Sequence, residues 1–292
     1  MMRFKVSFFA LCVLMILGAM TSCEKVALPE DLGTDTQKGN LRISIFEIEK
    51  TPFASLTRAL EAPSEACARL NYVIYTTDGE RLKQVNQTSD NANFGNCSFQ
   101  LEQGTYQLVI VGHSSNGNPT MTDPKKIQFT NAQGFTDTFL YCEYVTIGEE
   151  TVDLNVSLNR IVSMCRIVIT DDFPTNITKM RFYYTGGSGA FNAQTGLGCV
   201  NSKQLQTFDV TENQKEFDLY TFLHDTEGTI HLTITALDAN GNELYDHTTD
   251  VTMEQNHITW LTGALFNGST SSSTSTTVTI NTAWAGEKHL TF

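Results

Sequence analysis

The sequence lacks a long hydrophobic run and carries little positive charge. Its most apolar stretch, Val6 to Leu17, is shorter than the roughly 20 residues that a helix needs to span a bilayer. Lysine and arginine together number 19, against 32 aspartate and glutamate residues. Nucleic acids and anionic lipids attract basic surfaces, so this balance argues against both as electrostatic partners.

Compact chemical motifs are missing as well. No Cys-x-x-Cys and no His-x-x-x-His pair occurs, so no metal site is predicted. Ser188 lies in Gly-Gly-Ser-Gly-Ala, where Ala190 replaces the last glycine of a nucleophile elbow. Asp238 to Glu243 has its glycine at the fourth position of a would-be calcium loop, and a type I′ turn at Asn240-Gly241 explains the same residues. We therefore expect no enzyme, no cofactor and no catalytic residue.

The N-terminus has the pattern of a lipoprotein signal peptide. Arg3 and Lys5 precede the apolar run, and small-to-medium residues follow it and end at Cys23. Met20 stands three positions before Cys23, where leucine is more usual. Cleavage before Cys23 would make it the new N-terminus, and its thiol would carry the lipid. Two or more acyl chains hold a protein stably at a membrane, so we expect residence outside the cytoplasm on a membrane surface.

The mature chain is large enough for two domains. Removing residues 1–22 leaves 292 − 22 = 270 residues with a net charge of 17 − 32 = −15. Residues 23–40 are polar and rich in turn formers, and we interpret them as a lipidated tether. An apolar share of 40%, with 10% aromatic residues, is enough for a packed core.

The cysteines do not specify a disulfide framework. Cys12 leaves with the signal and Cys23 carries the lipid, so five remain: Cys67, Cys97, Cys142, Cys165 and Cys199. Their number is odd and their spacings are wide. Export would allow one or two disulfides, but small buried thiols in strands explain the same residues equally well, and the pairing stays open.

The periodicity of the remaining chain predicts strands. Leu41 to Ile48 is β-branched and aromatic, and Val152 to Leu158 alternates apolar and polar residues strictly. Further strands are predicted at residues 70–76, 106–111, 139–147, 162–170, 180–184, 217–223, 230–237, 243–252, 257–265, 278–284 and 290–292. Such spacing with turn residues between the strands predicts two tandem β-sandwiches, at residues 41–159 and 160–292.

Three passages, taken in order, resemble one family. The first is the lipoprotein start with an early strand and Thr57-Arg58-Ala59. The second is the run 154–162, followed by residues 171–174 and 182–184. The third is the run 230–238, which leads to residues 256–263 and a late Trp284. Over nearly the whole mature chain these resemble the fimbrillin-type fimbrial subunits of Bacteroidales (type V pili). The resemblance is greatest to their FimB-like anchor and accessory members.

That resemblance implies two tandem transthyretin-like Greek-key β-sandwich domains and export as an outer-membrane lipoprotein with an acyl chain such as palmitate. In polymerising members a protease cuts after an arginine behind the first strand, and a neighbouring subunit's strand fills the groove that opens. The matching position here is Arg58, with Ala59 as the new N-terminus. Anchor members keep the first strand. Residues 278–292 could donate a strand to a neighbour, but we expect them to fold back into their own domain.

The resulting hypothesis is a non-enzymatic, lipid-anchored surface protein. It would seat or cap a fimbria by strand complementation, with fimbrial shaft subunits and the outer membrane as partners. One alternative is a glycan-binding surface lipoprotein, which needs aromatic residues on an exposed platform. Another is a fimbrial tip or adhesion subunit, and a third is a hydrolase without a sequence signature. The sequence leaves open which pilus is meant, whether Arg58 is cut and which host ligand is bound.

Overall fold

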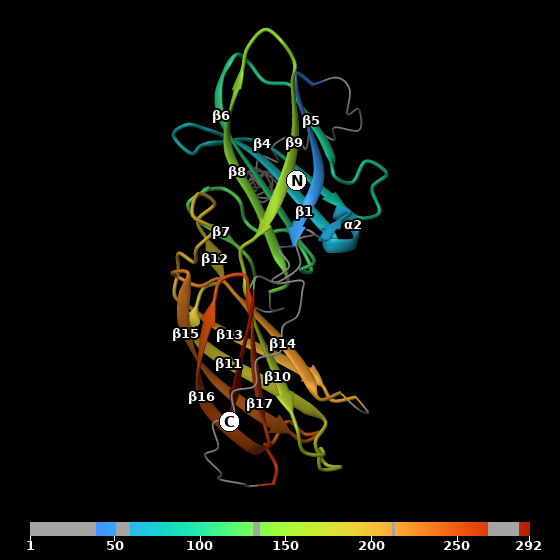
Figure 1. Cartoon of the computed structure of the whole chain (residues 1–292), viewed down its shortest axis with the longest axis vertical. Coiled ribbons are helices and arrows are strands. Elements are labelled where there is room, and N and C mark those ends of the chain that lie inside the picture. The colour runs from blue at the N-terminus through green and yellow to red at the C-terminus, as the bar shows by residue number, and fades with distance from the viewer. Residues whose placement is uncertain (1–38, 51–58, 131–134, 212–213, 268–285) are drawn as a thin grey trace, which may run out of the picture. The chain divides into compact units, whose positions relative to one another are not determined.

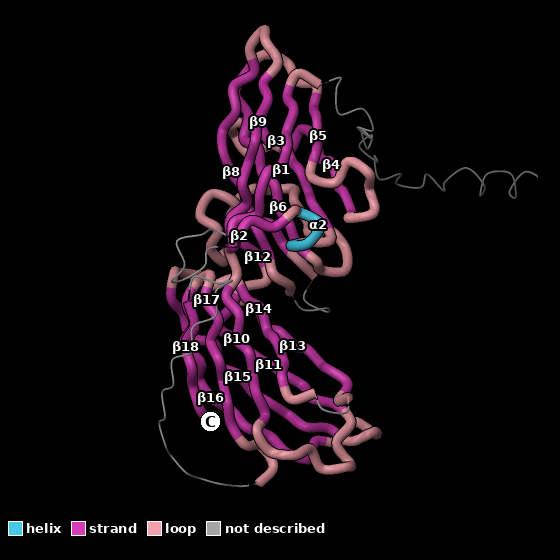
Figure 2. Tube along the Cα trace, turned by 45° about the vertical axis from the view of Figure 1, so that its right-hand side comes forward, coloured by secondary structure: helices cyan, strands magenta, loops and turns pink. Residues whose placement is uncertain are grey.

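Strands dominate the structure. It is a computed structural model that describes residues 39–50, 59–130, 135–211, 214–267 and 286–292. Within these ranges one short helix, α2 (Pro63–Ala66), accompanies the strands (Figure 2). None of the described helices is long and apolar enough to cross a membrane. The prediction of an all-β protein is confirmed.

Two sets of strands follow one another along the chain (Figure 1). The first set comprises β1 (Leu41–Lys50), β2 (Ala59–Glu61), β3 (Arg69–Thr76), β4 (Arg81–Thr88), β5 (Asn96–Phe99), β6 (Gly104–His113), β8 (Thr138–Ile147) and β9 (Val152–Arg160). The second set comprises β10 (Ser163–Ile169), β11 (Lys179–Gly187), β13 (Ser202–Asp209), β14 (Glu216–Thr221), β15 (Glu227–Leu237), β16 (Glu243–Glu254), β17 (His257–Gly263) and β18 (Gly286–Thr291). The short strands β7 (Ile127–Gln128) and β12 (Ala190–Phe191) pair with each other.

The first strand set folds one hydrogen-bonded sheet over on itself. Its order is β2-β1-β9-β8-β6-β3-β4. β5 also pairs with β1, at residues 41–44 on the side away from β9, while β2 pairs with the end of β1 at residues 48–50. β8 meets β9 through only two residue pairs, Phe139 with Arg160 and Leu140 with Asn159. The layer β5-β1-β9 therefore turns at this corner and faces the layer β8-β6-β3-β4 across an apolar core.

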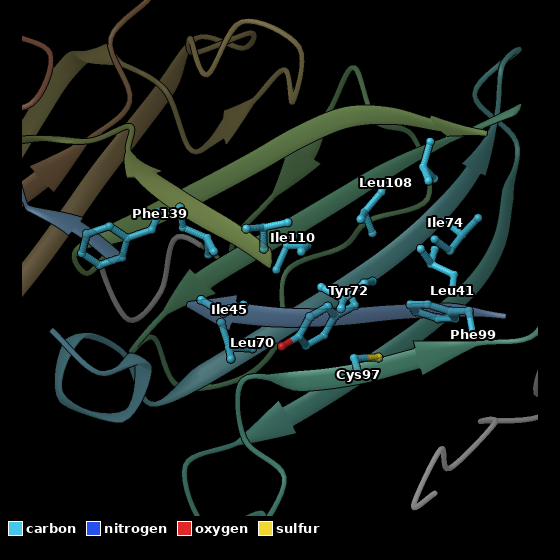
Figure 3. Packing of buried hydrophobic residues seen from close by; sticks show 14 of the residues in the cluster. Leu41, Ile45, Leu70, Tyr72, Ile74, Cys97, Phe99, Leu108, Ile110 and Phe139 are labelled. Atoms are coloured by element: carbon cyan, nitrogen blue, oxygen red, sulfur yellow. The ribbon is translucent and has the colours of Figure 1, made fainter. Parts of the chain in front are cut away.

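That core is formed by inward-facing residues of both layers. Leu41, Ile43 and Ile45 of β1 are at most 7% exposed, and Tyr72 of β3 is fully buried opposite them. Figure 3 shows side chains from β1, β3, β5 and β6 directed into this one cluster. Apolar residues at alternate positions of these strands form the faces that pack together, while the opposite faces of β3 and β6 are also buried.

The second strand set repeats the same arrangement in two separate sheets. The order β14-β10-β17 corresponds to β5-β1-β9, and β13-β11-β15-β16 corresponds to β4-β3-β6-β8. β1 lies between antiparallel β5 and parallel β9, and β10 likewise lies between antiparallel β14 and parallel β17. The second set adds β18 at the outer edge of β17 (Figure 2).

A third apolar cluster gathers residues from both strand sets. It includes a group of four phenylalanine rings whose neighbouring centroids lie 4.9 to 6.4 Å apart: Phe129, Phe135, Phe191 and Phe222.

The Arg160 side chain, 1% exposed, binds the Asp137 carboxylate through two hydrogen bonds of 2.6 and 2.7 Å. Arg160 Nη1 also donates to Asn256 Oδ1 at 3.4 Å, in the turn between β16 and β17. The expected domain boundary near Arg160 stays a prediction.

One local prediction was wrong. The Asn240-Gly241 turn is not type I′, since Gly241 has a φ of 83° and Asn240 does not share a positive φ. A type I′ turn needs positive φ at both central residues. Here the Asp238 carboxylate instead accepts hydrogen bonds from the backbone of Asn240 and Asn242.

Candidate functional site

β1 is a central strand and not an added edge. It pairs antiparallel with β5 from Leu41 to Ser44 and parallel with β9 from Leu41 to Glu49 (Figure 1). Hydrogen-bond partners therefore flank it on both sides. A strand in such a position leaves two unpaired neighbours if it is removed.

The two faces of β1 differ. Leu41, Ile43, Ile45 and Ile48 face the core, each at most 7% exposed. Burying such a side chain contributes about 1.5–3 kcal/mol, so these four together contribute roughly 6–12 kcal/mol as an upper estimate. That range matches the whole net stability of an ordinary domain, about 5–15 kcal/mol. The strand is thus indispensable to this fold unless another strand takes its place.

The predicted processing site lies next to β1. Arg58 falls outside the described residues, and so does the predicted lipidation site Cys23. Ala59 is the first residue of β2, which pairs antiparallel with β1: Ala59 lies opposite Lys50 and Glu61 opposite Ile48. Cleavage after Arg58 would therefore separate β1 covalently from a neighbour with which it still pairs.

The C-terminal strand pairs within its own sheet. β18 runs parallel to β17, with Trp260 opposite His289 and Thr262 opposite Thr291. Leu290 and Phe292 pack against the core of the second strand set. This agrees with the expectation that the C-terminus folds back; residues 278–285 of that segment lie outside the described part of the chain.

Gly263 makes the seating of β18 possible. A Cβ atom at this position would lie 2.5 Å from the Phe292 carbonyl oxygen, closer than any tolerated contact. Asn256, at the other end of β17, has a φ of 58° in the turn from β16. The first and last residues of the run 256–263 therefore mark a tight turn and a close approach, which small or turn-forming residues permit.

A ladder of polar and aromatic side chains crosses the outer face of this sheet. The Arg166 guanidinium binds the Asp218 carboxylate through hydrogen bonds of 2.7 and 2.8 Å. It also lies 5.0 Å from the centroid of the Trp260 ring. The His289 ring stacks on Trp260 at 5.6 Å with an interplanar angle of 12°. Cation–π and stacking contacts thus join β14, β10, β17 and β18 in register.

Two cysteines lie in the core of the first strand set. Cys67 and Cys97 are buried, and burial raises the pKa of each thiol to about 12. All five cysteines of the described part have free thiols, and only Cys199 among them is exposed. No cluster of metal-ligating side chains occurs among the described residues. The buried thiols are therefore protonated at neutral pH and poor nucleophiles.

Fold and strand pairing define an all-β protein of two repeated strand sets, with a central first strand in each. The model of a family of unknown function, DUF6562, matches residues 33–291, so the chain belongs to that family. Comparison with curated proteins gave no match.

Several solved structures are similar to the chain. The fimbrial anchor protein Mfa2 from Porphyromonas gingivalis is 13% identical, with a TM-score of 0.39 over 71% of this chain and 80% of that one. A fimbrial assembly protein from Parabacteroides distasonis is 8% identical, with a TM-score of 0.40 over 84% and 97%. The tip fimbrial protein Mfa3 from Porphyromonas gingivalis is 13% identical, with a TM-score of 0.35 over 73% and 80%.

Proposed function

We propose that the protein is a lipid-anchored accessory or anchor subunit of a fimbria, held in the outer membrane through Cys23. In this proposal the two strand sets are tandem transthyretin-like Greek-key sandwiches, and shaft subunits join the protein by strand complementation. The repeated order β5-β1-β9 and β14-β10-β17 supports the sandwich assignment. The protein is not an enzyme in this account.

The observation that carries the proposal is the complete first strand. β1 fills the position between β5 and β9 and buries four apolar side chains. A subunit that keeps this strand has no vacant groove there for a neighbour's strand. It also keeps the covalent path from Cys23 to the folded body. Both properties suit a subunit at the end of a polymer better than one within its shaft.

Complementation then needs an open sheet edge, and β18 provides one. It ends the order β14-β10-β17-β18, so no described strand pairs with its outer side. The Phe292 N–H donates to the Thr262 carbonyl of β17. Backbone donors alternate sides along a strand, so the Thr291 N–H points away from β17, toward the open edge. An incoming strand could pair there.

Anchoring is tested by cell fractionation of a Cys23→Ala variant. We expect this variant to leave the membrane pellet and enter the soluble fraction, because the acyl chains are lost and an acidic chain is not attracted to anionic lipid. Retention of the variant in the pellet would show that lipid on Cys23 is not the anchor.

Partnership is tested by capture of the detergent-extracted protein from fimbriated cells, with shaft subunits expected to come with it. The edge is tested with Thr291→Pro, which removes the outward donor and obstructs an added strand, against Thr291→Ala, which keeps the backbone N–H. We expect shaft subunits with the alanine variant and fewer with the proline variant. Equal recovery would exclude this edge, and no recovery with the unaltered protein would exclude the partnership.

A further inference from the structure

The outer face of β1 lies under a polar groove that the fimbrial proposal does not use. The groove has a volume of about 570 Å³. Its floor is formed where β1 meets β5 and β9, with Ser44 opposite Asn96 and Arg42 opposite Asp153. Asn93, from the β4–β5 connection, lines one wall.

The lining combines hydrogen-bond donors and acceptors without net charge. Arg42 and Asp153 are the charged residues that line the groove, and their side chains lie 3.9 Å apart. Ser44, Asn93 and Asn96 add a hydroxyl and two carboxamides, which both donate and accept. Asp153 would repel a strongly anionic ligand, and Arg42 would repel a strongly cationic one. Hydroxyl groups, which donate and accept at once, match all five side chains.

The wall of the groove is fixed by a buried side chain. Gln87 of β4 is 3% exposed. Its Nε2 donates to the Asn96 carbonyl at 2.7 Å and the Asn93 carbonyl at 3.3 Å, and its Oε1 accepts from the Gly95 N–H at 3.1 Å. The Ser44 hydroxyl donates to Asn96 Oδ1 at 2.9 Å, which joins the wall to the floor. A site held in this way loses little freedom when a ligand binds.

An exposed aromatic ring stands beside the groove. Phe46 follows Ser44 on the outward side of β1 and is 69% exposed, although it belongs to a strand whose other apolar residues are buried. Strand alternation places Phe46 on the outward face with Arg42 and Ser44, and the register shift between Ile45 and Glu47 then returns Ile48 to the core. A phenyl face offers a flat apolar surface to the C–H side of a sugar ring.

From these features we propose that the groove of Arg42, Ser44, Asn93, Asn96 and Asp153, together with Phe46, binds a neutral saccharide. Hydroxyl groups of the sugar bind the polar lining, and one ring stacks on Phe46. The site is distinct from the edge of β18 and from the anchor at Cys23, so it stands or falls independently of the fimbrial role.

Affinity electrophoresis of the full-length protein extracted in detergent tests the proposal. Gels containing dextran, yeast mannan, amylopectin or galactomannan provide neutral ligands, and gels with polygalacturonate or chondroitin sulfate provide acidic ones. We expect at least one neutral polysaccharide to retard the protein. Phe46→Ala and Asn93→Ala should each weaken that retardation about tenfold, a factor that corresponds to the loss of one good contact.

Tyr144→Ala is the matched control, because Tyr144 is an aromatic residue of β8 that is 53% exposed and does not line the groove. It should retain full retardation, and the circular dichroism spectra of all three variants should match the unaltered protein. The proposal is overturned if none of the neutral polysaccharides retards the protein. It is equally overturned if only the acidic ones do, or if both groove variants bind as strongly as the control.

Discussion

Truncating one core residue of β1 measures how firmly this strand belongs to the fold. Ile43 is 1% exposed and lies between β5 and β9, so Ile43→Ala leaves a cavity in the core of the first strand set. Such truncations lower the free energy of unfolding by about 2–5 kcal/mol. With a urea m-value of about 2–3 kcal/mol/M, the unfolding midpoint should fall by roughly 1–2 M.

Phe46→Ala supplies the control on the same strand. It removes a larger side chain, but one that is 69% exposed, so the free energy of unfolding should change by less than about 0.5 kcal/mol. Urea titration followed by circular dichroism measures both variants. If Ile43→Ala costs less than about 1 kcal/mol, or if β1 melts in a separate earlier transition, the reasoning that β1 is an integral strand is refuted.

Three further predictions concern other parts of the fold. Asp137→Ala removes the carboxylate that faces the buried Arg160 and should lower the free energy of unfolding, measured by urea titration, by about 3–5 kcal/mol. A loss below about 1 kcal/mol, as at a surface ion pair, would contradict the burial of the Arg160 guanidinium. Burial lowers the pKa of His113 from 6.5 to about 4, so between these two pH values the unfolded chain binds a proton that the folded chain does not. The free energy of unfolding should therefore fall by up to roughly 3 kcal/mol as the pH drops from 6.5 to 4. His113→Gln should flatten this part of the stability profile, and an unchanged slope would speak against the role of His113. Gly263→Ala places a methyl group against Phe292 and should lower the free energy of unfolding by about 1–3 kcal/mol. It should also speed carboxypeptidase digestion of the C-terminus, and an unaltered digestion rate would show that β18 does not depend on this close approach.

The sequence predicts the buried strands well because their alternation is strong. The run 152–158, with its strict period of two, corresponds to β9, in which Val156 and Leu158 are buried and Asp153 and Asn155 are exposed. The inward direction of Ile48 could not be predicted, because a bulge after Ile45 shifts the register by one residue and no local residue type announces it.

Polar edge strands escape sequence reasoning for a different reason. β13 was not predicted, since Gln204 and Gln206 occupy its inward positions opposite Tyr184 and Phe182. Gln204 is fully buried there, although a glutamine usually indicates an exposed position. The groove on β1 was missed likewise, since Arg42 and Asp153 are distant in sequence and meet only through the parallel pairing of β1 with β9.

The central claim is that the folded body keeps its first strand and its lipid on one covalent chain. Mass spectrometry of the protein extracted from outer membranes measures this directly. Our account predicts an acylated Cys23 at the N-terminus of a chain that continues through Arg58 without a break. A mature protein that begins at Ala59 and carries no lipid would contradict it.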